Sequence, residues 1–462
     1  MTPSPPVEES CFWMARRHAR RTPEPLQGVE EADVAIVGGG YTGLWTSLFL
    51  KELEPRRKVV VLEQELVGYG GSGRNAGIVG ETIDHSHELA IAHFGLDEAR
   101  RLARLGRENL DAMETFLRER GIDAGFERRG QLIVALRPEH LAALDQGREA
   151  AESVGSPGWR ILSRDETRSE LASPLYEGAL LAPRNGVVDP VRLTEGLRFV
   201  AVQAGVRIHE RTRVTRLAFR GDRVEISAGA AMLRARKLVL ATNAYTHHLR
   251  RSLARRFLPL YDYVLVSDPL TAAQRNAIGW RSRRAVVDVR TFFNYYRLTD
   301  DGRILWGTSE AAYYPGNRVD SSCDHSPRHY AALEESFRRH FPQLAGLAFP
   351  YRWGGPIAST TRLTPFFGDA NGGRLHYGLG YTGHGIGSTR IAGRILAHRA
   401  LELPSALLDL AMVRRKPIPF PPEPLRRAAV ALVTGALRRV DAGGKPGAVL
   451  RALERVGISF SS

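Results

Sequence analysis

The chain has 462 residues, enough to bury two hydrophobic cores, and 43% of them are hydrophobic, as in an ordinary globular enzyme. Its net charge is +15, but the basic residues are spread along the chain without interleaved aromatic residues, which argues against nucleic-acid binding. Two cysteines, Cys11 and Cys323, exclude a disulfide framework. Because we also see neither a signal-peptide pattern nor an apolar run of about 18 residues, we expect a cytoplasmic protein.

The strongest motif lies near the N-terminus, at Asp33–Trp45. A short apolar run, Val34–Val37, predicts a buried strand that leads into Gly38-x-Gly40-x-x-Gly43 and then into a helix. Gly38 permits a tight turn, Gly40 lets the backbone approach a pyrophosphate, and Gly43 lets helix and strand pack closely. The N–H groups at the start of the helix would then bind the phosphates.

A second predicted strand, Lys58–Leu62, ends at Glu63, twenty residues after Gly43. A carboxylate at this place can accept hydrogen bonds from the ribose hydroxyls of an adenosine. Strand, helix, second strand and terminal acid together predict dinucleotide binding.

Two further glycine-rich segments favour FAD over NAD. Gly68–Gly77 suits a loop pressed against a flat polar ring system. Gly378–Gly387 stands between a predicted strand, Leu375–Tyr377, and a predicted helix, Ser388–Ala400, whose N-terminus would stabilise an anionic reduced flavin. Because the first and last glycine-rich turns lie more than 300 residues apart, we expect one long cofactor to span both.

The middle of the chain alternates between two patterns. Asp189 as N-cap and Pro190 at the first position predict a helix that ends at Gly205. Four β-patterned runs follow over 206–241, and residues 251–349 alternate like antiparallel strands. The chain is therefore expected to cross repeatedly between two domains, with the ligand site in the crevice between them.

These motifs resemble those of the D-amino-acid-oxidase superfamily of FAD-dependent amine oxidoreductases, over residues about 30 to 400. Within it the chain is most similar to the γ-glutamylputrescine oxidase and aminophosphonate oxidoreductase group. The resemblance is carried by Asp33–Trp45, Ser72–Gly77, Leu238–Tyr245, Tyr296–Arg303 and Gly380–Gly385. It implies oxidation of an amine or amino-acid C–N bond to an imine and then a carbonyl, with oxygen as acceptor and hydrogen peroxide as product. An amine dehydrogenase that passes electrons to a quinone or carrier, and a flavin-binding protein without turnover, remain alternatives.

The resemblance implies an α/β fold: a Rossmann-type FAD-binding domain with a discontinuous α+β substrate domain built on a mainly antiparallel sheet. The predicted parts are an N-terminal extension (1–29), three FAD-binding parts (30–100, 185–250, 350–402), two substrate parts (101–184, 251–349) and a C-terminal helical tail (403–462).

The residues predicted to bind FAD lie in the glycine-rich turns and at strand ends, and Val214 stands where the family places a backbone contact to the adenosine. They are Gly38, Gly40, Tyr41, Thr42, Gly43, Glu63, Gln64, Gly71, Ser72, Arg74, Asn75, Ala76, Gly77, Val214, Thr242, Asn243, Gly380, Tyr381, Gly383, His384, Gly385 and Ile386. The backbone amides of Gly383, His384 and Gly385 are expected to stabilise the reduced flavin.

The predicted catalytic residues are His384, Arg297, Tyr296 and Trp306, and no metal site is predicted. Arg297 either clamps a carboxylate or phosphonate of the substrate, which would fit an anionic amine, or braces the turn at Asp300 and Asp301. The His384 ring either packs as a structural histidine or lies near the active site. Second-rank candidates are Tyr261, Tyr263, Tyr381, Arg352 and Trp353.

Two segments of the sequence lack residues that some members of the family use. Sarcosine-oxidase-like members attach the flavin through a cysteine in the segment that matches Gly354–Pro365, which has none here, so the FAD is expected to be non-covalent. Those members also activate oxygen with a lysine on the strand that matches Arg303–Gly307, and this strand has no lysine. A dehydrogenase or a slower oxidase therefore stays open.

The tail after Pro417 is distinct. Pro419–Pro424 is a stiff spacer, and Leu425–Val440 predicts a basic amphipathic helix. Contact with a membrane surface or a partner is one interpretation. A helix packed back on the protein is favoured, because Asp441–Gly444 and a second short helix are typical of a folded cap.

Overall fold

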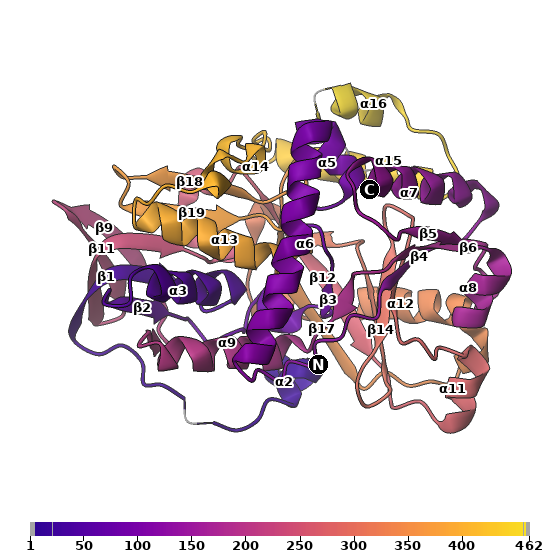
Figure 1. Ribbon diagram of the computed structural model, residues 1–462, viewed down its shortest axis with the longest axis horizontal. Helices are drawn as coiled ribbons and strands as arrows, with labels where there is room; N and C mark the ends of the chain where they lie inside the picture. Colours follow the sequence, from indigo (N-terminus) through magenta and orange to yellow (C-terminus); the bar gives the residue numbers. More distant parts are fainter. Residues whose placement is uncertain (1–4, 21, 456, 459–462) are drawn as a thin grey trace.

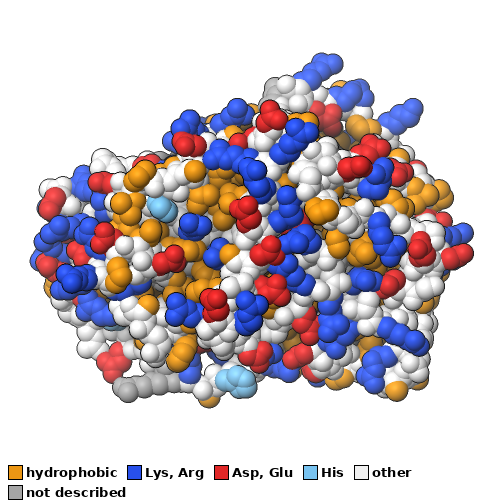
Figure 2. All heavy atoms as spheres, in the orientation of Figure 1, with side chains coloured by type: hydrophobic (Ala, Val, Ile, Leu, Met, Phe, Trp, Pro, Cys, Tyr) orange, Lys and Arg blue, Asp and Glu red, His pale blue; other side chains and the backbone are white. Residues whose placement is uncertain are grey.

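The computed structural model describes residues 5–20, 22–455 and 457–458, so residues 1–4 of the predicted extension and the last residues of the tail lie outside the described part. Two large sheets, of eight and nine strands, lie side by side, and helix α6 (Leu96–Glu119) runs between the two halves of the molecule (Figure 1). On the face drawn in Figure 2, basic and acidic side chains are interspersed over both halves.

The first sheet has the predicted parallel core. Its main strand order is β18-β19-β11-β1-β2-β8, where β1, β2, β8, β11 and β19 are parallel and β18 is antiparallel to β19. The bounds are β1 Val29–Val37, β2 Val59–Leu62, β8 Arg207–His209, β11 Ala231–Leu240, β18 Phe366–Ala370 and β19 Leu375–Leu379; the hairpin β9 (Arg216–Arg220) and β10 (Arg223–Ala228) extends β11.

Three helices pack with this sheet: α3 (Tyr41–Leu53), α9 (Pro190–Gln203) and α13 (Gly385–Ala400). The predicted cap of α9 is confirmed, since the Asp189 carboxylate accepts hydrogen bonds from the N–H groups of Val191 and Arg192, both at 2.9 Å. The strand expected at Val34–Val37 is confirmed as the buried half of β1, a continuous apolar run of the kind that parallel sheets bury on both faces.

The second sheet is mainly antiparallel, as expected, with order β16-β12-β15-β14-β13-β4-β6-β5 and β17 added beside β12. Only the β13–β4 pair among its described strand pairs is parallel. The bounds are β4 Gln131–Ala135, β5 Arg160–Leu162, β6 Gly178–Ala182, β12 Leu258–Val266, β13 Ala285–Asp288, β14 Asn294–Leu298, β15 Ile304–Thr308, β16 Ala312–Tyr313 and β17 Tyr351–Ser359.

One predicted boundary is wrong. Residues 350–402 were expected to belong to the FAD-binding domain, but β17 pairs with β12 along its whole length and therefore extends the second sheet. The chain returns to the first sheet only at β18. The reason is that an antiparallel partner nearly a hundred residues away in sequence leaves no local signal in the strand itself. The other predicted boundaries remain a proposal.

The remaining elements cover the edges and link the sheets. The helices are α1 Val7–Ser10, α2 Phe12–Ala15, α4 Gly71–Arg74, α5 His87–Phe94, α7 Leu141–Ser153, α8 Arg164–Glu170, α10 Thr246–Leu249, α11 Ala272–Ile278, α12 Pro327–His340, α14 Ala411–Arg414, α15 Leu425–Asp441 and α16 Ala448–Arg455; β3 (Ile78–Val79) pairs with β7 (Gly186–Val187). Among the described residues, no helix combines the length and apolar character that a bilayer crossing requires.

Candidate active site

A cavity of about 1250 Å³ is lined by residues of both sheets. Small-molecule pockets usually measure roughly 300–1,000 Å³, so this cavity has room for a dinucleotide together with a substrate. Its lining includes the start of α3 and the ends of β2 and β11 from the first half, and β12, β14 and the loops beside them from the second sheet.

The fingerprint turn is built so that only glycine fits. Gly38 has φ +110°, and a Cβ there would lie 2.6 Å from the Ala241 carbonyl oxygen. A Cβ on Gly43 would lie 1.9 Å from the carbonyl oxygen of Gly38, which keeps the first turn of α3 against β1. Gly38 and Gly40 line the cavity, with Tyr41 and Thr42. The backbone cradle therefore fits a pyrophosphate at the N-terminus of α3.

Glu63 lies beside this turn, at the end of β2. Its carboxylate accepts hydrogen bonds from the N–H of Gly39 at 2.7 Å and from the N–H of Glu65 at 3.0 Å. Burial raises the pKa of Glu63 to about 6. Glu63 lines the cavity together with Gln64 and Val214, so all three predicted adenosine contacts lie on the cavity wall.

The second glycine-rich loop is tied to the first. The Ser72 hydroxyl accepts a hydrogen bond of 2.9 Å from the N–H of Tyr41. Asn75 braces its own loop, since its amide donates to the carbonyl of Gly71 and accepts from the N–H of Gly77. Gly71, Ser72, Arg74, Asn75, Ala76 and Gly77 all line the cavity, as do Thr242 and Asn243 at the end of β11.

Arg74 connects this loop to the second sheet. Its guanidinium forms a 2.8 Å ion pair with Asp324 and donates to the carbonyl of Gly354 at 3.2 Å. The indole N–H of Trp353, on β17, donates to the Arg74 carbonyl at 2.9 Å. The buried Arg74 side chain therefore fixes the loop against β17 at the cavity wall.

The C-terminal glycine-rich turn lies directly against the N-terminal one. The Thr42 hydroxyl donates a hydrogen bond of 2.9 Å to the hydroxyl of Tyr381, although the two residues are 339 positions apart. The N–H of Gly380 donates to the side-chain oxygen of Asn243 at 3.1 Å. Tyr381, Gly383, His384, Gly385 and Ile386 line the cavity, whereas Gly380 and Gly43 support it from behind.

His384 faces a second histidine that the sequence analysis missed. The rings of His384 and His85 lie 4.0 Å apart between centroids, and both residues line the cavity. Burial lowers the pKa of both, most strongly that of His85, so both rings are neutral near pH 7. The titratable run Asp84–His87, just after the glycine-rich loop, was the available signal for His85.

A carboxyl and a phenol of the second sheet were not among the predicted site residues. Tyr295 on β14 donates a 2.5 Å hydrogen bond to Oδ2 of Asp262 on β12, and both side chains line the cavity. The N–H of Tyr263 donates to the other carboxylate oxygen at 2.7 Å. Burial raises the pKa of Asp262 to about 7. An aspartate within the apolar strand Leu258–Val266 was the available signal.

Arg297 is not among the described residues that line the cavity. Its buried guanidinium donates to the carbonyl oxygens of Gly77 at 3.0 Å and Val188 at 2.7 Å. It therefore braces two loops of the FAD-binding half, and these contacts support neither predicted role, substrate clamp or brace of the Asp300 turn.

Tyr296 and Trp306 also lie away from the cavity. Their rings stack at 4.4 Å in the core beneath α12, and the hydroxyl of Tyr296 is hydrogen-bonded to that of Tyr176. Because side chains alternate between the two faces of a strand, Tyr295 faces the cavity and Tyr296 faces the core. The predicted catalytic role of this pair is therefore corrected to packing.

The second-rank candidates also divide between the cavity wall and the core. Trp353 and Tyr381 line the cavity, and Tyr261 and Tyr263 lie in the core. Arg352 forms an ion pair of 2.9 Å with Glu334 on α12.

Comparison with known proteins places this geometry in a family. Residues 33–399 match the DAO family, described as FAD dependent oxidoreductase. The gamma-glutamylputrescine oxidoreductase of Escherichia coli (strain K12) is 31% identical over 368 residues, which cover 79% of this chain and 82% of that protein. A probable oxidoreductase of Haemophilus influenzae, OrdL, is 29% identical over 382 residues, 82% of this chain and 84% of its own length.

Solved structures agree on the fold. Glycine oxidase from Geobacillus kaustophilus superposes with a TM-score of 0.69 at 20% identity, covering 84% of this chain and 99% of that one. L-proline dehydrogenase from P. horikoshii gives a TM-score of 0.67 at 17% identity, over 82% and 95% of the two chains. Because the family match spans well over half of the sequence, this chain belongs to the DAO family of FAD-dependent oxidoreductases.

Proposed function

We propose that this enzyme oxidises the C–N bond of an amine or amino acid to an imine, with oxygen as the electron acceptor. The hydrogen bond between Thr42 and Tyr381 carries the proposal, because it joins the two glycine-rich turns at one cavity that continues to the second sheet. The names of the relatives, gamma-glutamylputrescine oxidoreductase and glycine oxidase, support a nitrogen-bearing substrate.

The chain offers a distinct set of residues to each part of FAD. Glu63, Gln64 and Val214 would hold the adenosine, and the start of α3 with Ser72 would hold the pyrophosphate. The flavin end would lie among Arg74, Asn75, Ala76, Thr242, Asn243 and Gly383–Ile386. Bound among these residues, the cofactor would supply a two-electron acceptor for the hydride of the carbon next to nitrogen.

Asp262 and Tyr295 are suited to hold the substrate nitrogen. An ionised carboxylate in a largely apolar cavity attracts an ammonium group, and the Tyr295 hydroxyl fixes the orientation of the Asp262 carboxylate. The amine must lose a proton before its carbon can lose a hydride, and a carboxyl with a pKa of about 7 can take that proton near neutral pH.

The electrons and protons balance. The nitrogen gives a proton to Asp262, the carbon gives a hydride, and water converts the imine to a carbonyl and ammonia or an amine. The two electrons, the hydride's proton and the proton held by Asp262 convert oxygen to hydrogen peroxide.

The FAD-loaded enzyme can be tested with a panel of amines, D-amino acids and aminophosphonates. Loss of the yellow flavin absorbance without air would support amine oxidation, and hydrogen peroxide in air would support oxygen as acceptor. Bleaching without peroxide would instead favour a dehydrogenase that uses a quinone or carrier. If no compound of the panel bleaches the flavin, the proposed reaction is wrong.

A further inference from the structure

The C-terminal helix α15 forms part of the cavity wall. Its lining residues recur on one helical face, at Ala429, Val430, Val433, Thr434 and Leu437. The extended segment before the helix adds Pro419, Phe420 and Pro421. The tail therefore packs back on the protein, as favoured from the sequence, and one face of its helix is turned towards the site.

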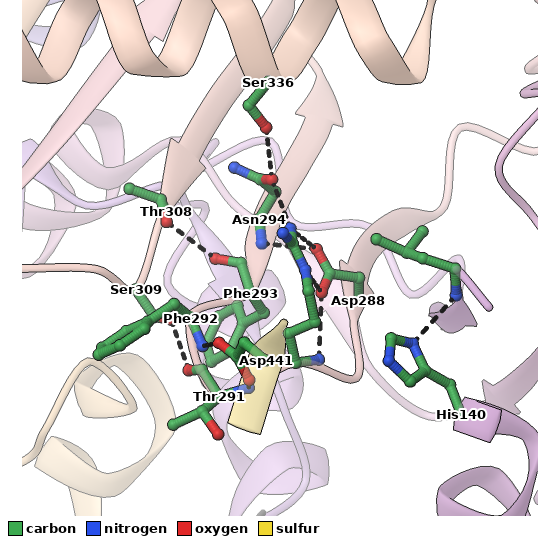
Figure 3. A network of polar contacts seen from close by, with 12 residues as sticks. His140, Asp288, Thr291, Phe292, Phe293, Asn294, Thr308, Ser309, Ser336 and Asp441 are labelled. Atoms are coloured by element: carbon green, nitrogen blue, oxygen red, sulfur yellow. Dashed lines mark hydrogen bonds and ion pairs between the residues drawn. The ribbon is translucent and has the colours of Figure 1, made fainter. Parts of the chain in front are cut away.

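Asp441 holds the end of this helix against the second sheet. Its two carboxylate oxygens accept hydrogen bonds from the N–H of Thr291 at 2.9 Å and the N–H of Phe292 at 2.8 Å, as Figure 3 shows. Arg137 donates to the Asp441 carbonyl at 2.9 Å. The helix end and the loop that carries Phe292 and Phe293 are thus fixed together.

That loop is supported from beneath by a second polar network (Figure 3). The buried Asp288 carboxylate accepts from Arg290 at 2.7 Å and from the N–H of Asn294 at 2.8 Å. Ser336 on α12 donates to the side-chain oxygen of Asn294 at 2.7 Å. The buried carboxylate is therefore fully partnered, and the loop keeps Phe292 and Phe293 on the cavity wall.

The start of α15 is anchored as well. The buried Arg426 donates to the side-chain oxygen of Asn317 at 2.6 Å and to the Pro421 carbonyl at 2.9 Å. Arg438, near the other end, donates to Glu310 at 2.7 Å. Arg426 and Arg438, two of the basic residues behind the membrane or partner interpretation, therefore form contacts within the chain, and α15 is a fixed part of the wall.

We propose that apolar side chains of this cavity wall, among them Phe292, Val433 and Leu437 of one hydrophobic cluster, form an apolar annex of the active site that binds the non-reacting, hydrocarbon part of the amine substrate. The apolar annex consists of Leu144, Phe292, Phe293, Val430, Val433 and Leu437. None of these six described side chains is charged, and they line the same cavity as Asp262 and Tyr295. An amine with an alkyl or aryl chain would place its nitrogen at Asp262 and its chain in the apolar annex. This assignment rests on the proposed function.

The test uses α,α-dimethylalkylamines of increasing chain length. Their nitrogen-bearing carbon has no hydrogen, so they bind without being oxidised, and isothermal titration of the FAD-loaded enzyme reports binding alone. If the annex takes the chain, each added methylene tightens binding by up to about fourfold until the annex is full. An affinity that does not change with chain length would overturn the proposal, whereas the proposed reaction itself fails only in the bleaching experiment.

A matched pair of variants on α15 locates the effect. Val433→Asp places a charge in the annex and should remove the chain-length dependence, weakening the longest amines by more than about tenfold. Leu432→Asp, at the neighbouring position that is 54% exposed, should bind like wild type. Because Val433→Asp can disturb the packing of α15, Val433→Phe is the second variant: it fills the annex with an apolar ring and should weaken only the longer amines. Wild-type binding of long amines by both Val433 variants would overturn the assignment.

Discussion

Tyr295 reaches Asp262 across the intervening strand β15 because residue 307 is a glycine. Gly307 lies opposite Tyr295 on one side and opposite Val264 on the other, and a Cβ at Gly307 would come within 2.3 Å of the Tyr295 ring. The missing side chain leaves the space through which the phenol passes to its 2.5 Å hydrogen bond with Asp262. A glycine on a central strand thus assembles the proposed amine-binding pair.

Gly307→Ala should therefore disrupt this pair without touching either residue. The hydrogen bond from Tyr295 lowers the pKa of Asp262, which burial has raised to about 7, so its loss should move that pKa further upward. We expect the rising limb of the pH profile of kcat/KM to shift to higher pH in Gly307→Ala and equally in Tyr295→Phe. If both variants keep the wild-type profile, Asp262 is not the group that titrates.

Asp262→Asn should slow flavin reduction by amines by about 10²–10⁴-fold, the usual contribution of a general base. The amide cannot take the ammonium proton, and it lacks the charge that attracts the substrate. Stopped-flow bleaching without air measures this step directly. Asp268→Asn, at an exposed carboxyl that follows the same strand, is the control and should react at the wild-type rate.

Glu63→Ala should weaken FAD binding by about 1–3 kcal/mol and leave the reaction unchanged. The substitution removes the acceptor for the N–H groups of Gly39 and Glu65 and any acceptor for the ribose hydroxyls. Fluorescence titration of the deflavinated protein with FAD gives the dissociation constant. An unaltered constant would mean that Glu63 neither holds the turn nor meets the ribose.

Acid or heat treatment should release all of the flavin into solution. Neither Cys11 nor Cys323, both within the described residues, lines the cavity, and burial raises the pKa of Cys11 to about 12, so its thiol is not ionised at neutral pH. Absorbance of the supernatant after precipitation measures the release. A yellow pellet would contradict the prediction and point to one of the histidines that line the cavity, His85, His87, His248 or His384.

The FAD-binding half was predictable because dinucleotide binding requires particular residue types at fixed spacings along the chain. Only glycine fits at Gly38 and Gly43, because a Cβ there would collide with a backbone carbonyl oxygen. A parallel strand covered by helices, such as β2, is a continuous apolar run that can be recognised in the sequence. The C-terminal glycine-rich turn was also visible in the sequence, and the hydrogen bond between Thr42 and Tyr381 brings it against the first turn.

The substrate half was less predictable because it depends on which face of a strand each residue occupies. Tyr295 and Tyr296 are adjacent and chemically equal, and only the register of β14 decides that Tyr295 meets the cavity. The proposed role of Asp262 depends on its hydrogen bond with Tyr295, which lies two strands away in the sheet. The wall formed by α15 depends on contacts such as that of Asp441 with Thr291, 150 residues apart, which no local pattern encodes.

Arg297→Lys tests the corrected role of this arginine. Lysine keeps the charge but loses the planar fork that donates to the carbonyl oxygens of Gly77 and Val188, and an unpaired buried carbonyl costs about 1–3 kcal/mol. We expect a lower melting temperature, normal FAD content once folded and a KM close to that of wild type. Arg328→Lys, at an exposed position, should leave the melting temperature unchanged. A large rise in KM for anionic amines with unaltered stability would restore the substrate clamp that the buried position of Arg297 argues against.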